Sequence, residues 1–481
     1  MKSHGNPGGH GLWLVAGLTL LLVAGTATAT PIALADGGTA GFVGQAQQGP
    51  LDQPVLVESY AQFTATFGAS TGGLADPYLA PSAAAFFVNG GQHLWVVRVA
   101  GADDASLIGS DGGSPASRTG LQALRDVDAI ALVAIPGAVA PAVQAALITH
   151  CENVGHRLAI LDAASASDLN AVIAQRAALS TADGYAALYF PWVQAAPAGE
   201  SLLLPPSGFV AGVMARTAPP VVPTGAVISA TGVSFAVNTT QQNQLTPLGI
   251  DTIRFLAGQG VQVWGARTLA GNPQWIYASA RRVGLTIAAS VQAGTAWCLP
   301  QPNDAALWAQ LRSDTADFMQ GLFLAGWFQG VTPDQAYFVR CDQTTMTQQD
   351  LDAGRTNILV GFAPITPAEF LILTIVQQRS AATAAPPGPP SLALPAPHPN
   401  PFNPRTTIRF EVPAAGSVRL AVFDLAGRLI RTLVDADLPP GPHEAIWDGR
   451  DSAGRGMASG EYLARLEAGG RARAVRLSLV R

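Results

Sequence analysis

Between residues 129 and 190 the sequence alternates between continuous apolar stretches and stretches of helical pattern, and this rhythm constrains the fold more than any other feature. The five segments, strand-like and helix-like in turn, are 129–134, 141–154, 158–162, 167–178 and 185–190. Apolar strands without polar alternation are typical of strands covered on both faces, and alternation with helices is typical of a parallel sheet. The sequence therefore predicts a small βαβαβ unit.

The regions on either side of this unit are predicted to form one larger mixed core. A chain of 481 residues is too long for a single core, so two to four domains are expected. We interpret 30–103 and 206–380 as the two parts of a core of mixed sheet and helices, and 104–205 as an α/β domain inserted between them. The strongest predicted helix, 303–328, lies in the second part.

The last hundred residues predict a linker and a separate all-β domain. Residues 381–398 are rich in Ala and Pro, which is typical of an extended, semi-rigid linker. Residues 399–481 alternate with period two between turn signals such as Asp448-Gly449, so they predict a small antiparallel β-sandwich.

Residues 1–29 have the three-part layout of a secretory signal peptide. Lys2 lies in a short polar stretch, an apolar run follows at 12–25, and Ala27-Thr28-Ala29 forms a small-x-small cleavage site. The apolar run is shorter than the roughly 20 residues of a membrane span. A cleaved signal is the main interpretation; an uncleaved anchor, or a buried or wrongly assigned start, are the alternatives.

The composition favours contacts with protein over contacts with nucleic acid. Only 12% of residues are charged, about half the usual ~25%. Such a surface loses little solvation when another subunit covers it, although a weakly soluble monomer would have the same composition. The net charge is −5 and no basic run occurs, which argues against direct binding of nucleic acid.

The motifs that could carry chemistry are weak. Gly68-Ala69-Ser70-Thr71-Gly72 matches the nucleophile pattern G-x-S-x-G, but a helix-like stretch precedes it where a buried strand is required. His150, Cys151 and His156 lie close in sequence without a fourth ligand nearby, and the three cysteines of the chain match no zinc spacing. We therefore predict no catalytic residue, no cofactor and no metal, and hence a protein that is not an enzyme.

Three stretches resemble the phage tail sheath family in order and spacing, over roughly residues 31–378. The first begins at Gly41-Phe42-Val43-Gly44 and ends near residue 68, the second is 205–217, and the third runs from 263 to 370. The motif residues that we assign in the third stretch are Trp264, Gly265, Arg267, Thr268, Arg340, Cys341, Asp342, Thr344, Thr345 and Met346.

The C-terminal domain carries a second resemblance. Residues 398–404, His-Pro-Asn-Pro-Phe-Asn-Pro, are followed by a strand-like segment, by Trp447-Asp448-Gly449 and by Ser459-Gly460-Glu461-Tyr462. This order is similar to that of Ig-like modules such as the one in the flagellar hook-capping protein FlgD. Such modules often end exported bacterial proteins.

The sheath resemblance implies a structural subunit that polymerises around a tube and contracts, in a phage tail or a related contractile injection system. Its implied partners are other copies of itself, the tail tube and baseplate proteins. We expect no stable membrane span. The family links subunits by arms that add a strand to a neighbour's sheet. Our candidates for a donated strand are Phe370, Leu371, Ile372, Leu373, Thr374, Ile375 and Val376, and the alternative is that they form a strand of the subunit's own core.

Two departures from the family keep a second function open. The signal-like segment stands where family members usually carry an N-terminal arm, and the linker and Ig-like domain follow where they usually end. The alternative is therefore an exported, surface-attached binding or structural protein that reuses a sheath fold. The N-terminal segment favours export or the cell surface, whereas the sheath core favours assembly in the cytoplasm.

Overall fold

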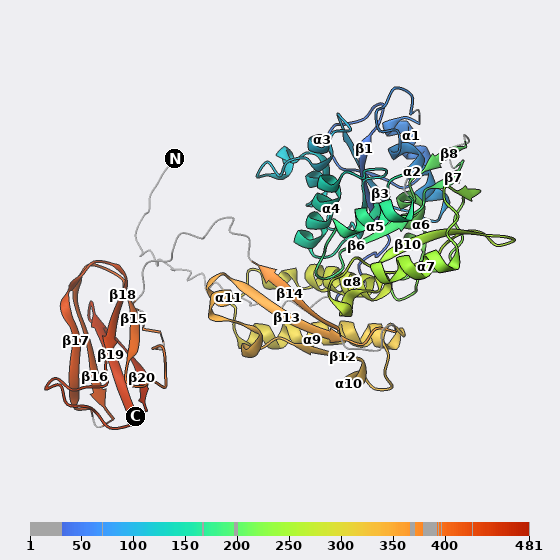
Figure 1. The fold of residues 1–481 in the computed structure, drawn as a ribbon. Coiled ribbons are helices and arrows are strands. Elements are labelled where there is room, and N and C mark those ends of the chain that lie inside the picture. The colour runs from blue at the N-terminus through green and yellow to red at the C-terminus, as the bar shows by residue number, and fades with distance from the viewer. Residues whose placement is uncertain are drawn as a thin grey trace, which may run out of the picture. The chain divides into compact units, whose positions relative to one another are not determined.

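The computed structural model describes residues 31–69, 71–165, 168–196, 201–365, 371–378, 392, 394–395, 397–425 and 427–480. The predicted signal segment, Ser70, Phe370 and most of the predicted linker lie outside the described residues. The chain divides into two compact units, Met1–Arg379 and Ser380–Arg481 (Figure 1).

The first unit is built on an eight-stranded sheet. In spatial order its strands are β11 (Gly260–Val263), β10 (Ile250–Leu256), β6 (Ala186–Phe190), β5 (Leu158–Asp162), β4 (Leu132–Ala134), β1 (Ala40–Gln45), β3 (Leu94–Val99) and β2 (Val55–Val57). The six inner strands pair in parallel, and the strands at the two edges pair antiparallel. A predominantly parallel sheet must be covered on both faces.

Helices cover both faces of this sheet. Successive residues of a strand point to opposite faces, so Leu132 packs into one apolar cluster and Val133 into another. The first cluster joins the sheet to α1 (Tyr60–Phe67), α2 (Leu79–Val88) and α6 (Ser207–Arg216). The second joins it to α3 (Asp104–Ile108), α4 (Pro141–Val154), α5 (Leu169–Ala177) and α7 (Thr239–Leu245).

The predicted βαβαβ rhythm is present, but its strands do not form a sheet of their own. The bounds of α4 and β5 agree with the prediction, and β4, β5 and β6 are parallel. However, β4 also pairs with β1 and β6 pairs with β10, so segment 104–205 supplies central strands of the large sheet. The inserted domain at 104–205 therefore shares its sheet with the rest of the unit, and its bounds remain a prediction.

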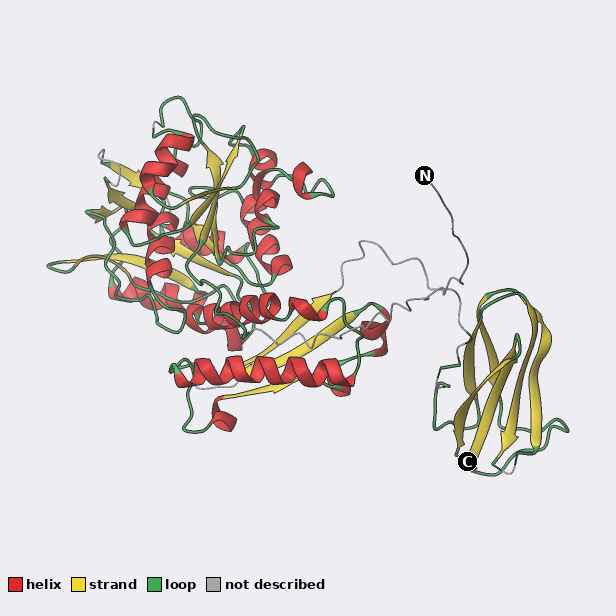
Figure 2. Cartoon of the chain, turned by 180° about the vertical axis from the view of Figure 1, so that it is seen from behind, coloured by secondary structure: helices red, strands yellow, loops and turns green. Residues whose placement is uncertain are grey.

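A second, smaller sheet completes the first unit. Its order is β12 (Tyr337–Arg340), β13 (Arg355–Phe362) and β14 (Leu371–Gln378), and all pairs are antiparallel. The apolar cluster beneath it includes residues of α8 (Ala278–Gly294) and α9 (Ala305–Leu324), and Figure 2 shows α9 lying along the sheet. The α9 helix begins after Asp304, whose carboxylate accepts hydrogen bonds from the amides of Ala306 and Leu307.

The remaining elements of this unit are short. A three-stranded sheet has the order β8 (Leu202–Leu204), β7 (Val193–Ala195) and β9 (Gly232–Val233). Two short helices, α10 (Pro333–Ala336) and α11 (Gln348–Asp352), flank β12 and β13. In the part of the chain that the structure describes, no helix is both long and apolar enough to cross a membrane.

The second unit is an antiparallel β-sandwich, as predicted. One layer pairs β15 (Thr406–Val412) with β18 (Gly441–Trp447). The other has the order β17 (Leu429–Leu438), β16 (Gly416–Asp424), β19 (Gly460–Ala468) and β20 (Arg471–Leu479). Trp447 is fully buried between the layers, with its ring centroid 5.5 Å from that of Phe402 and 5.1 Å from that of Tyr462. The predicted fold class, mixed α/β and α+β with a C-terminal β-sandwich, is confirmed.

Candidate functional site

Strand β14 lies at an edge of the three-stranded sheet β12–β13–β14. It pairs with β13 over its whole length, from Leu371 opposite Phe362 to Gln378 opposite Arg355. Among the described strands nothing pairs with its other side. Because alternate residues of an antiparallel strand direct their amide and carbonyl groups away from the partner, about half of the backbone of β14 remains available to another strand.

The two faces of β14 have different environments. Leu371 is fully buried beneath the sheet, whereas the next residue, Ile372, is 50% exposed. At the end of the strand the Gln377 side chain donates hydrogen bonds of 2.7 Å to the Gln292 carbonyl and to Thr295 Oγ1. This strand is therefore anchored in the core of its own subunit while its edge stays open, so its role as a donor or acceptor of strands remains a prediction.

The face of the sheet β12–β13–β14 opposite α8 and α9 carries both apolar and polar side chains, and we call it the outer face. Its apolar positions and its one glycine are Phe338, Leu359, Gly361, Ile372 and Val376, and its polar positions are Arg340, Arg355, Asn357, Thr374 and Gln378. A Cβ on Gly361 would lie 2.1 Å from the Phe338 ring, so only glycine lets that ring lie flat on β13. The Arg340 guanidinium lies 5.2 Å from the centroid of the same ring.

The first group of motif residues forms the loop that leaves β11. The amide of Arg267 donates to both carboxylate oxygens of Asp251, at 2.9 and 3.1 Å. A Cβ on Gly265 would lie 2.4 Å from Asp251 Oδ1, so this carboxylate requires glycine there. Thr268 Oγ1 donates to the Trp275 carbonyl at 2.6 Å. The motif thus joins the large sheet to the segment that begins α8.

Asp251 itself was not singled out from the sequence. Burial raises its pKa to about 8, the amide of Arg267 opposing the shift. A signal was present, because Asp251 is the single acidic residue between positions 201 and 303. Trp264 lies nearby, its ring centroid 5.5 Å from the Arg254 guanidinium.

The second group of motif residues turns the chain from β12 toward β13. Asp342 accepts a 2.8 Å hydrogen bond from the amide of Thr344, and Thr345 Oγ1 donates to the Asn357 carbonyl at 3.1 Å. The Asn357 amide in turn donates to the sulfur of Met346 at 3.3 Å, and Cys341 is buried. These residues shape the small sheet, and the structure brings them to a different place from the first group.

The weak chemical motifs lie in separate parts of the first unit. Helix α1 precedes the segment 68–72, and Ser70 lies outside the described residues. His150 contacts Arg157 Nη1 at 2.9 Å, and its pKa is lowered to about 3, chiefly by burial. Among the described residues no group of three or more His, Cys, Asp or Glu side chains could hold a metal ion.

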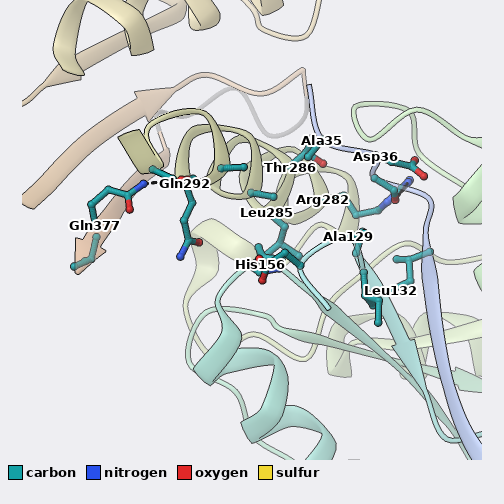
Figure 3. A pocket seen from close by; sticks show the side chains of 18 of the residues that line it. Ala35, Asp36, Ala129, Leu132, His156, Arg282, Leu285, Thr286, Gln292 and Gln377 are labelled. Atoms are coloured by element: carbon teal, nitrogen blue, oxygen red, sulfur yellow. Dashed lines mark hydrogen bonds between the residues drawn. The ribbon is translucent and has the colours of Figure 1, made fainter. Parts of the chain in front are cut away.

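A cavity of about 610 Å³ lies between α8, the start of β4 and the end of β14 (Figure 3). Leu285, Thr286 and Arg282 form one wall. The Arg282 guanidinium is buried and donates to the carbonyls of Met214 and Thr217, which ties α8 to the end of α6. Thr286 contributes the hydroxyl of the lining, and Asp36, Asp128 and His156 also line the cavity.

The comparisons with known proteins agree with this arrangement. Residues 113–269 match the phage tail sheath protein central domain. The chain contains a phage tail sheath central domain. Residues 403–471 of this sheath-domain protein match the FlgD Ig-like domain, which confirms the second resemblance. No curated protein matches the sequence.

The sheath-domain protein also has the fold of contractile sheath subunits. It resembles a chain of the anti-feeding prophage helical sheath in the contracted state, with 24% identity, a TM-score of 0.59, and coverage of 76% of this chain and 100% of that one. A chain of the anti-feeding prophage baseplate has 24% identity, a TM-score of 0.58, and coverage of 78% and 100%. A chain of the extracellular contractile injection system PVC sheath complex has 23% identity, a TM-score of 0.55, and coverage of 79% and 99%.

Proposed function

We propose that this chain is a structural subunit that polymerises into the contractile sheath around the tube of a phage tail or phage-like contractile injection system. The observation that carries the proposal is that the whole fold of contracted sheath subunits is contained in this chain. The family is structural, so the proposed role involves no catalysis.

The open edge of β14 supplies a means of linking subunits. We propose that residues 370–376 pair with a strand of a neighbouring copy, while β13 holds β14 from the other side. Backbone hydrogen bonds along such an edge give affinity without needing charged side chains, which this chain largely lacks. A repeated contact of this kind that does not close on itself generates a helix of subunits.

The proposed partners are other copies, a tail tube and a baseplate. Contraction requires two packings of the same subunits separated by a barrier, with the extended packing held kinetically. Each subunit must therefore keep its own core intact while its contacts with neighbours change. The anchoring of β14 through Leu371 and Gln377 fits that requirement.

Electron microscopy of the purified full-length protein tests the proposal. We expect rings or tubes of uniform diameter in negative stain. A protein that stays monomeric at high concentration, alone and with its cognate tube, would contradict it.

A specific observation favours a second candidate, an exported, surface-attached protein that reuses the sheath fold. The FlgD Ig-like domain at 403–471 and the signal-like segment at 1–29 lie at opposite ends of the chain and both resemble features of exported proteins. Under this candidate the native chain begins near Thr30 and is found at the cell surface. N-terminal sequencing of the native protein decides between the two locations, because a cytoplasmic chain that retains Lys2 excludes export.

A further inference from the structure

The cavity of about 610 Å³ between α8, the start of β4 and the end of β14 forms a largely apolar groove (Figure 3). Its lining follows one side of α8 from Arg282 to Ala293. Leu132 and Leu285 are buried in this lining, whereas Ala293 is exposed and Val376 on β14 is 38% exposed. Apolar surface is unfavourable in water, and a hollow of this size can hold several side chains. The groove is therefore suited to an apolar segment of protein.

The first described residues of the chain run along α8 to this groove. A Cβ on Gly294, at the end of α8, would lie 2.8 Å from the Ile32 side chain. The amide of Ala35 donates to Ser290 Oγ at 2.9 Å, and residues 35–37 belong to the lining of the groove. The chain therefore enters the described structure within a few residues of the groove.

The segment that precedes this point contains the apolar run 12–25. Residues 26–30 separate the run from Pro31, and five extended residues span at most about 17 Å. As a helix the run would be about 21 Å long, and α8, with 17 residues, is about 25 Å long. A short tether also keeps the run at a high local concentration beside the groove. The run is thus near enough and long enough to lie along α8.

The charges of the groove fit the polar stretch that precedes the run. Asp36 and Asp128 are exposed residues of the lining, whereas the guanidinium of Arg282 is buried and donates to backbone carbonyls. Residues 1–11 include Lys2 and no acidic residue, so they carry positive charge. Opposite charges on two surfaces favour their association and fix its direction.

We infer that this groove binds the apolar run 12–25 of its own chain in a protein that retains residues 1–29. The contact removes apolar side chains of both the run and the groove from water. A run buried there is hidden from a secretion machinery, so the groove gives the signal-like segment a role in a chain that stays in the cytoplasm. The inference goes beyond the proposed sheath function and does not depend on polymerisation.

A photo-crosslinking amino acid in place of Gln292 tests the contact, because Gln292 is an exposed residue of the lining. Cell-free synthesis without membranes gives full-length protein that retains residues 1–29. We expect adducts between position 292 and the peptide 12–25, mapped by mass spectrometry. In a mixture of isotope-labelled and unlabelled protein, these adducts should join residues of the same copy. Adducts with the run of another copy, or adducts that do not involve the run, would overturn the inference.

Protection from chymotrypsin gives a second readout. Ala293→Arg places a long charged side chain on the wall of the groove, and we expect cleavage within 12–25 to become at least about tenfold faster. Ala309→Arg is the matched control, because Ala309 is also an exposed alanine of a helix, α9, and does not line the groove. Thermal unfolding checks that both variants fold.

Three results of these measurements would contradict the inference. They are equal protection in the two folded variants, rapid cleavage within 12–25 in the unsubstituted protein, and a native chain that begins near Thr30. A full-length protein that forms no polymer, with or without its tube, would contradict the proposed sheath function and leave the predicted protection unchanged.

Discussion

The first unit, Met1–Arg379, is called the sheath-like unit below. Its two main sheets differ in how completely helices cover them. The eight-stranded sheet has helices on both faces, and its inner strands bury residues on both sides, as Leu132 and Val133 do. Among the described residues, helices cover only one face of the sheet β12–β13–β14, and no strand pairs with the outer edge of β14. The comparison suggests that the large sheet holds the subunit together, whereas the small sheet is the part shaped for contacts with neighbours.

Removing residues 104–205 should have the largest effect on this comparison. The deletion takes away β4, β5 and β6, which lie between β1 and β10 in the large sheet. We expect the sheath-like unit to lose its cooperative unfolding transition. Circular dichroism during thermal denaturation measures this. A shortened protein that still unfolds cooperatively with a native-like midpoint would show that the segment is an independent insertion after all.

The stability of the large sheet should fall as pH rises, because of Asp251. Burial raises the pKa of this carboxyl to about 8, whereas an unfolded chain has a value of about 3.9. Between these values the folded state holds a proton that the unfolded state has released. The contribution of Asp251 to stability is therefore greatest below about pH 4 and decreases by up to about 1.4 kcal/mol per pH unit as pH rises toward 8.

Asp251→Asn is the control for this dependence. The amide can still accept from the Arg267 N–H but does not titrate in this range. Urea unfolding at several pH values from 5 to 8 should give a flatter profile for the variant than for the unsubstituted protein. Parallel profiles would mean that Asp251 does not carry the effect.

Adjacent substitutions in β14 should separate core packing from assembly. Leu371→Ala removes a fully buried side chain and should lower the free energy of unfolding by about 2–5 kcal/mol. Ile372→Ala removes a half-exposed side chain on the outer face, so the monomer should lose much less stability while assembly weakens. Equal losses of monomer stability in the two variants would contradict the difference between the faces.

Ending the chain after Gln378 should have the smallest effect on the sheath-like unit. The β-sandwich has its own apolar core around Trp447 and belongs to a separate compact unit. We expect the unfolding midpoint of the sheath-like unit to stay unchanged in differential scanning calorimetry, with the transition of the sandwich lost. A lower midpoint for the remaining unit would show that the two units stabilise each other.

Local patterns were enough to predict most individual elements. Continuous apolar runs identified β5 and β6, and polar caps such as Ser59 and Asp304 mark where α1 and α9 begin. These features depend on neighbours a few residues away, which the sequence displays directly. The family resemblance then indicated how the elements of the core combine.

Long-range pairing could not be predicted in the same way. The residue pattern of β4 does not show whether this strand pairs with β1 or lies at the edge of a separate sheet. Both arrangements require the same run of apolar residues. The sequence shows that Asp251 is the single acidic residue between positions 201 and 303, but it does not show that the carboxylate accepts from a backbone amide 16 residues away. The open edge of β14 follows from strand order, which local alternation does not specify.

The position of β14 also decides how the sheath-like unit responds to mechanical load. Tension transmitted from the C-terminal domain enters the unit at Gln378, the end of β14 that lies opposite Arg355, where β13 begins. A pull at this end, directed away from β13, places the load on one hydrogen bond between β13 and β14 at a time, beginning at Gln378. The strand would then detach from its Gln378 end, once the hydrogen bonds of the Gln377 side chain to Gln292 and Thr295 are broken. The backbone edge of β13 would be exposed as β14 detaches, so a pulled subunit would offer its neighbours a fresh strand edge.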